Sequence, residues 1–152
     1  MIRTGRIVAV WIGVALSGCA VSRGGMPSSA PAGSEAQNLT RWIAEHPFSP
    51  DINIGVVELG STGTSSFHIV HVRDRERMHV HQHHDLVAVL QQGHGTLQFQ
   101  SKRLHMTVGS VVAIPRGTPH AFINESRQPA EILVVFSPPF DIMDTVLIDE
   151  AP

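Results

Sequence analysis

Three patterns of hydrophobic and polar residues follow one another along the chain. An uninterrupted apolar run occupies residues 7–16, and residues 20–37 consist mainly of Ser, Gly, Ala and Pro with almost no large apolar groups. From residue 52 onward, short β-branched runs alternate with Gly and Pro residues. These patterns predict a leading hydrophobic segment, a linker that cannot bury enough surface to fold, and a β-rich domain.

The β-rich part predicts an all-β fold, because eight or nine short strands at this spacing are typical of a sandwich or barrel. One short helix is expected before them at residues 38–46, with Asn38 as N-cap and Pro47 as its stop. The expected strands are Ile52–Leu59, Ser66–Val72, Met78–His81, Leu86–Leu90, Thr96–Gln100, Val111–Ile114, His120–Ile123, Ile132–Phe136 and Val146–Ile148.

The N-terminal run is typical of an export signal. Arg3 and Arg6 precede ten apolar residues, which are too few for a helix to cross a bilayer, where about 20 are needed. The run ends in Leu-Ser-Gly-Cys at residues 16–19, which resembles the lipobox of bacterial lipoproteins. The resemblance implies removal of residues 1–18, a lipid on Cys19, and a flexible tether over residues 19–37. Ala20 after the cysteine implies sorting to the outer membrane, facing the periplasm, in a Gram-negative host.

Composition narrows the chemistry of the domain. The single Cys among 152 residues excludes an internal disulfide and a Cys-rich zinc site. A formal charge of -2 and only 5% aromatic residues argue against a nucleic-acid partner. The chain has ten His, and six of them fall within residues 68–84. The histidine side chains are therefore the candidate functional groups of the domain.

His79 and His81 are two residues apart, so on a strand they share one face. Two imidazoles on one face are half of a site for an ion such as Zn, Fe, Mn, Ni or Cu. The alternative is a solvated polar edge strand with histidines in the following loop.

A second motif joins this pair to a known family. Residues 109–124 have the spacing G-x5-P-x-G-x2-H-x3-N, with Gly109, Pro115, Gly117, His120 and Asn124 at the fixed positions. This spacing resembles the second signature of the cupin superfamily at every fixed position. Glycine suits the two turns because it adopts positive φ without strain. His120 is then expected at the start of a strand, aimed into a barrel.

The first cupin signature, G-x5-H-x-H-x3,4-E-x6-G, is matched in part. The H-x-H pair is present, and Gly93 falls on the final Gly when the four-residue spacing is used. That spacing puts Leu86 at the family's Glu position, whereas the three-residue spacing puts Asp85 there. The likeness covers about residues 52–136, within a predicted domain at 38–152.

The resemblance implies a single cupin β-barrel of the jelly-roll type with one divalent metal ion (Fe, Mn, Zn or Ni) bound by His79, His81 and His120. A metal-free pocket that uses these imidazoles as hydrogen-bonding groups is the alternative. Asp85 shares strand parity with His79 and would face the pair if the strand continues to it. A turn at residues 82–84 would cancel that argument. Asp85 is expected as the fourth ligand, and His84 or no protein residue are the alternatives.

Function is less determined than the site. A metal-dependent enzyme of dioxygenase, isomerase or decarboxylase type, acting on a small oxygenated molecule, is one hypothesis. The others are a non-enzymatic protein that binds a metal or small ligand and a structural envelope lipoprotein. Polar groups in the pocket beyond the ligands would favour catalysis. Expected partners are a small molecule in the barrel and a membrane reached only through the lipid, and a homodimer is left open.

The remaining candidates have structural interpretations. Arg116 is expected as a surface charge at the barrel mouth, and Phe140 as packing over a barrel end or a partner's edge. We expect structural or solvated roles for His68, His71, His94 and His105, and a surface role for His83, whose alternative by strand parity is to face the pocket.

Overall fold

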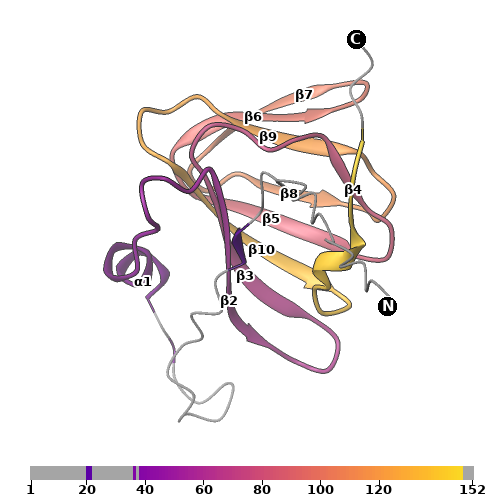
Figure 1. The fold of residues 1–152 in the computed structure, drawn as a ribbon, viewed down its shortest axis with the longest axis horizontal. Helices are drawn as coiled ribbons and strands as arrows, with labels where there is room; N and C mark the ends of the chain where they lie inside the picture. Colours follow the sequence, from indigo (N-terminus) through magenta and orange to yellow (C-terminus); the bar gives the residue numbers. More distant parts are fainter. Residues whose placement is uncertain (1–19, 22–35, 37, 149–152) are drawn as a thin grey trace, which may run out of the picture.

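The computed structural model describes residues 20–21, 36 and 38–148, and its strands form two facing antiparallel sheets (Figure 1). The predicted signal segment 1–18 and Cys19 lie outside the described residues, so they stay predictions. The six-stranded sheet has the order β1 (Ala20–Val21), β2 (Ile54–Ser61), β3 (Ser66–Val72), β10 (Ala130–Ser137), β5 (Asp85–Gln92) and β8 (Val111–Ile114). The five-stranded sheet has the order β11 (Thr145–Leu147), β4 (His79–His81), β9 (His120–Asn124), β6 (His94–Phe99) and β7 (Arg103–Thr107).

This arrangement confirms the all-β jelly-roll class. Adjacent strands pair antiparallel, except that β1 runs parallel to β2. Two residues of the predicted tether, Ala20 and Val21, therefore lie against the sheet.

The main core lies between the sheets and follows from strand alternation. In β5, Leu86, Ala88 and Leu90 are buried while Val87 is exposed, as expected where one face meets the core. Leu90 has no exposed surface at all. Burial of such side chains contributes roughly 25 cal/mol per Å² of apolar surface, which makes this interior the main source of stability. The core thus surrounds the inward-facing positions of both sheets.

A second, smaller core lies on the outer face of β2 and β3, where α1 (Leu39–Glu45) packs (Figure 1). Trp42 of this helix is buried with Val57 and Ile69. The N-cap is as predicted, because Asn38 Oδ1 accepts the Arg41 N–H at 2.9 Å.

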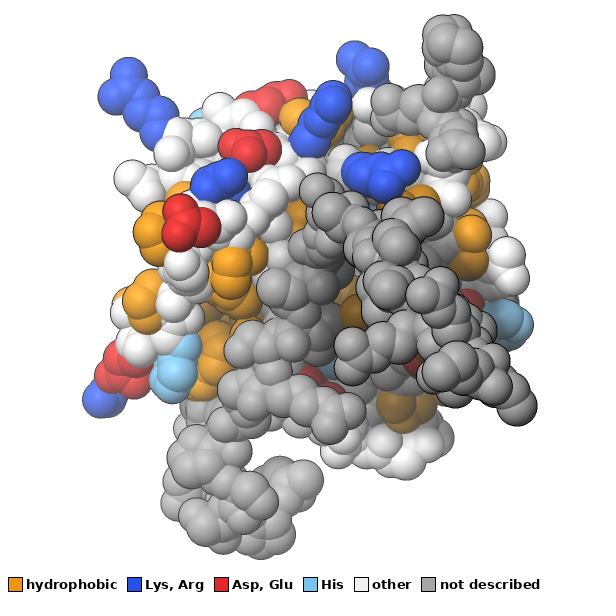
Figure 2. Space-filling view, in the orientation of Figure 1, with side chains coloured by type: hydrophobic (Ala, Val, Ile, Leu, Met, Phe, Trp, Pro, Cys, Tyr) orange, Lys and Arg blue, Asp and Glu red, His pale blue; other side chains and the backbone are white. Residues whose placement is uncertain are grey.

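Besides β1, two elements differ from the expectation. The strand β7 has no counterpart among the expected strands, because it is a sheet edge whose side chains are mostly solvated and Met106 alone is buried. A 3-10 turn, η1 (Ile142–Asp144), precedes the short strand β11. In the part of the chain that the structure describes, no helix has both the length and the apolar character to cross a membrane. Figure 2 shows basic and acidic side chains intermixed in the upper part of one face.

Candidate metal centre

The three predicted histidines meet inside the barrel. His79 and His81 lie on β4, and His79 is the register partner of His120 on the neighbouring strand β9. Their residues are 8%, 5% and 5% exposed in chain order. One ring nitrogen from each lies within 4.8 Å of the other two. A single ion can therefore be shared by all three side chains.

The turn of the second signature is bonded directly to the strand that carries the H-x-H pair. Gly117 has φ +74°, a conformation that suits glycine, and its N–H donates to the His81 carbonyl at 2.7 Å. His120 follows three residues later at the start of β9. The two motifs are thus parts of one local structure.

Backbone carbonyls fix the orientation of two imidazoles. His79 Nδ1–H donates to Arg77 O at 2.8 Å, and His120 Nδ1–H donates to Thr118 O at 2.9 Å. A carbonyl only accepts, so the hydrogen must be on Nδ1, and in the neutral ring the lone pair is on Nε2. Metal-ligating histidines commonly donate their other nitrogen in this manner.

The surroundings favour neutral imidazoles. Burial, with the neighbouring His79 and His120 rings adding to it, lowers the pKa of His81 to about 3. Burial also lowers the pKa of His120, again with a contribution from His79. Metal ions bind the neutral form. The donor set, three imidazoles in an apolar interior, therefore suits the ions Zn, Fe and Ni.

His81 Nδ1 is buried and has no hydrogen-bond partner among the described residues. Next to it, His84 and Asp144 complete a second group of three buried residues whose polar atoms lie within 4.8 Å of one another. Asp144 accepts the backbone N–H groups of Gln82 at 3.1 Å and His83 at 3.0 Å, and it also pairs with the His84 ring. Burial acts to raise the pKa of Asp144, but these hydrogen bonds outweigh it and hold the pKa below its usual range. The C-terminal segment thus fixes the turn that follows β4.

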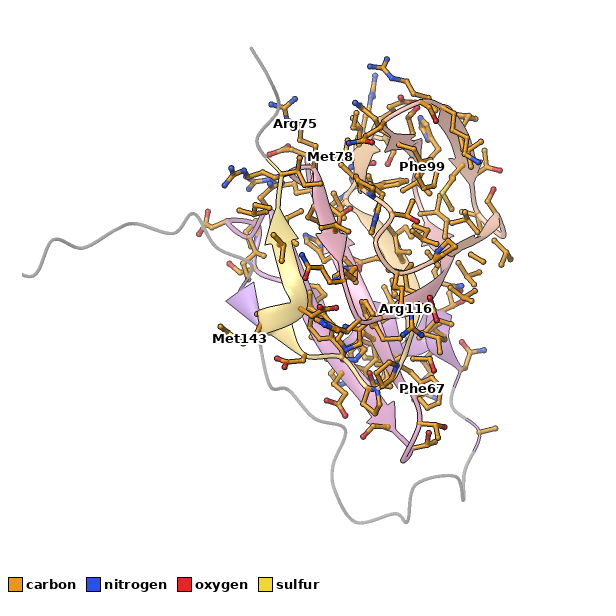
Figure 3. The ribbon with its side chains drawn as sticks, turned by 90° about the vertical axis from the view of Figure 1, so that its right-hand side faces the viewer. Phe67, Arg75, Met78, Phe99, Arg116 and Met143 are labelled. Carbon is orange, nitrogen blue, oxygen red and sulfur yellow. The ribbon has the colours of Figure 1, made fainter. Side chains whose placement is uncertain are left out.

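The structure does not bring Asp85 to the three histidines. β4 ends at His81, residues 82–84 form a turn, and the strand-parity argument for Asp85 is therefore wrong. The Asp85 side chain is 49% exposed and accepts from Arg116 N at 2.9 Å and Nη2 at 2.6 Å. The side-chain hydrogen bond from Arg116 lowers the pKa of Asp85 to about 2. Arg116 is a surface charge, as expected, and Figure 3 shows it toward the same end of the barrel as Phe67 and away from Arg75.

The histidines line a small cavity of about 50 Å³, and its wall includes a carboxylate that the sequence did not indicate. Glu76 lies in the irregular segment before β4, three residues from His79. In a regular strand, a residue three positions from His79 would lie on the opposite face, so strand parity does not predict Glu76 in this cavity. The other wall residues are apolar: Val70, Leu86, Ala88, Leu97, Met106, Ile114, Phe122, Ile132, Val134 and Phe136.

The other histidines lie outside this cavity wall. His68 is buried against Phe140, with ring centroids 5.3 Å apart, and bonds to the Ser66 hydroxyl at 2.8 Å. His71 is buried and pairs with Glu131 at 2.7 Å. Phe140 packs on Phe136, with ring centroids 4.5 Å apart, which confirms its expected packing role. His83 is exposed, as expected for a surface role, and His94 and His105 are exposed too.

Comparisons with known proteins agree with this fold. A family model described as "Cupin domain" matches residues 66–136. An uncharacterized protein of Aquifex aeolicus (strain VF5) is 30% identical over 115 residues, which cover 76% of this chain and 93% of that protein. The crystal structure of TT1209 from Thermus thermophilus superposes with a TM-score of 0.60 at 22% identity, over 70% of this chain and 99% of that chain. A variant of Streptomyces PAC13 with uridine has a TM-score of 0.52 at 14% identity, over 61% of this chain and 74% of that chain. At these identities, the solved structures show the fold.

Proposed function

The chain belongs to the cupin family, and on that premise we propose that it binds one divalent metal ion through His79, His81 and His120 and holds a small oxygenated molecule beside it. The observation that carries this proposal is the convergence of three buried ring nitrogens from two adjacent strands. Fe, Mn, Zn and Ni are the candidate ions, and the three imidazoles favour Zn, Fe and Ni among them. When bound, such an ion supplies Lewis-acid chemistry or activates a bound molecule.

The residues around the three imidazoles have distinct tasks in this proposal. The Arg77 and Thr118 carbonyls hold two rings with Nε2 free. The apolar wall excludes water, which strengthens electrostatic interactions inside the cavity. Three protein ligands leave at least one coordination position for a small molecule.

Two observations bear on what occupies that position. The solved structure of a variant of Streptomyces PAC13 contains uridine, which supports a small-molecule ligand for this barrel as well. The cavity also carries one polar group beyond the histidines, Glu76, and this favours catalysis on a small oxygenated molecule. The alternative function is non-enzymatic binding of a metal or small ligand at the envelope.

The metal site is tested by comparing the bound-metal content of histidine variants. We expect about one divalent ion per chain in the wild type and almost none in the His79→Ala/His81→Ala double variant. Loss of the ion should also lower the melting temperature, because an ion that binds only the folded state stabilises it. The matched control is His94→Ala/His105→Ala, which removes two exposed imidazoles and should retain the ion. Full occupancy after removal of His79 and His81 would overturn the assignment.

We also propose that the protein is a lipoprotein anchored through Cys19 to the outer membrane, facing the periplasm, with residues 19–37 as the segment that links the lipid to the domain and of which Ala20 and Val21 pair with β2. Its support is the lipobox-like sequence at residues 16–19 and the presence of one Cys in the chain. Cys19→Ser should move the protein from the membrane fraction to the soluble fraction. Membrane association equal to that of the wild type would contradict the anchor.

A further inference from the structure

The cavity wall contains one carboxylate in an otherwise apolar and imidazole surface. Besides the three histidines, the described residues that line the cavity are ten apolar side chains and Glu76. Carboxylates are rarely placed against such a surface without a partner. The half-buried position of Glu76 in this wall is therefore unusual for a carboxylate and points to a role in binding.

Glu76 is held firmly on the strand that carries His120. Its backbone N–H donates to Phe122 O at 2.9 Å, and its Oε2 accepts the Phe122 N–H at 2.8 Å. Phe122 is only 1% exposed and lies two residues after His120, so Glu76 is bonded to a buried residue of the metal-site strand. The second oxygen, Oε1, has no hydrogen-bond partner among the described residues. One carboxylate oxygen, Oε2, is thus fixed by the backbone, and the other, Oε1, is available to a ligand.

The geometry argues against Glu76 as the missing metal ligand. Its oxygens are not part of the group whose atoms lie within 4.8 Å of one another, which consists of His79, His81 and His120. Glu76 shares the cavity wall with them without belonging to that group. Its carboxylate therefore lines the same cavity in which a molecule at an open coordination position would lie.

Charge and hydrogen bonding define what that molecule must offer. A divalent ion with three neutral imidazoles keeps two positive charges, and the Glu76 carboxylate offsets one of them. The remaining charge favours a monoanionic ligand. A carboxylate can only accept hydrogen bonds, so an anionic or carbonyl oxygen facing it is repelled and a hydroxyl is attracted.

We infer that Glu76 determines ligand specificity by accepting a hydrogen bond from the hydroxyl group of a short hydroxycarboxylate held at the ion. The inference rests on the proposed metal site. The small cavity restricts the ligand to a few heavy atoms. Within that size range, a 2-hydroxy acid combines one negative charge with a hydroxyl donor next to it.

The test compares two probes of nearly equal size on the full-length chain loaded with Co²⁺. Glycolate offers a hydroxyl donor, whereas fluoroacetate carries in its place a fluorine that cannot donate. Their dissociation constants are measured from changes in Co²⁺ absorption. We expect the wild type to bind glycolate with a dissociation constant at least about tenfold lower than that of fluoroacetate. One charge-assisted hydrogen bond contributes about this much, and chelation by the hydroxyl adds to it.

Glu76→Gln separates the contribution of the carboxylate from chelation. The variant keeps an oxygen for the Phe122 N–H and therefore the fold, and it should bind Co²⁺ with the wild-type stoichiometry. Its preference for glycolate should fall about tenfold relative to the wild type. Glu125→Gln, which changes a carboxylate that is 44% exposed and paired with Thr96, is the control and should behave as the wild type.

The outcomes separate the two proposals. A preference in Glu76→Gln equal to that of the wild type, or no glycolate binding to Co²⁺-loaded protein, would overturn the role of Glu76 and leave the metal site standing. Absence of Co²⁺ from the wild type would overturn the metal site itself.

Discussion

Removal of the Asp144 carboxylate tests whether the C-terminal segment positions the metal-binding strand. Asp144 is 7% exposed and accepts hydrogen bonds from the turn that directly follows β4. Directly after Asp144 in the chain, β11 pairs with β4, so that Thr145 lies opposite His81 and Leu147 opposite His79. Asp144→Ala therefore removes the side chain that ties this segment to the turn.

The size of the effect follows from the groups left without partners. The His84 ring, which is 3% exposed, loses its carboxylate, at a cost of about 2 kcal/mol, and the amides of the turn add about 1 kcal/mol. A loss of about 3 kcal/mol corresponds to a fall in melting temperature of about 12 °C for a domain of this size. Metal affinity should fall about 10- to 100-fold, as when the groups that orient metal ligands are removed.

The assay pairs thermal unfolding of the metal-free protein, followed by circular dichroism, with a Zn²⁺ competition titration against a chromophoric chelator. Asp141→Ala is the matched control, because Asp141 is exposed in the same segment and its carboxylate accepts a hydrogen bond from the Met143 N–H at 2.9 Å. A melting temperature within about 2 °C of the wild type in Asp144→Ala, on the order of experimental error, would refute the reasoning.

Two further predictions concern Asp85 and the pH dependence of stability. Asp85→Ala should bind the metal with an affinity within about twofold of the wild type, because this half-exposed carboxylate pairs with Arg116 away from the histidines. A tenfold loss of affinity in a chelator competition titration would show that Asp85 is a metal ligand. For His81, the pKa of about 3 in the folded chain lies below the value of about 6.5 expected in the unfolded chain, so the unfolded state binds the extra proton as the pH falls below 6.5. The free energy of unfolding of the metal-free protein should then decrease by up to about 1.4 kcal/mol per pH unit from this group, and equal denaturant midpoints at pH 7 and pH 5 would contradict that sign.

Much of the fold could be predicted from the sequence, because strands with one buried face carry a period-2 pattern. β5 and β10 were expected close to their observed bounds for this reason. β7 was missed because an edge strand with one buried residue has little pattern to detect. His79 and His81 could be paired because they share a strand face, and His120 was added by the resemblance of residues 109–124 to the second cupin signature, whose turn contains Gly117.

The surroundings of the site could not be predicted in the same manner. Asp144 meets His84 across 60 residues of sequence, and no local periodicity reports such a contact. Glu76 lies in an irregular segment, where strand parity does not apply. Asp85 was misplaced for the related reason that the chain turns between β4 and β5. In each case, the deciding feature is a backbone bend or a long-range contact.

The central claim is that His79, His81 and His120 bind one metal ion, and anomalous diffraction at the absorption edge of the bound metal tests it most directly. We predict one anomalous peak per chain, about 2.0–2.1 Å from a ring nitrogen of each of these three histidines if the ion is zinc. A peak elsewhere, or an absent peak in crystals grown with the ion in excess, would contradict the claim.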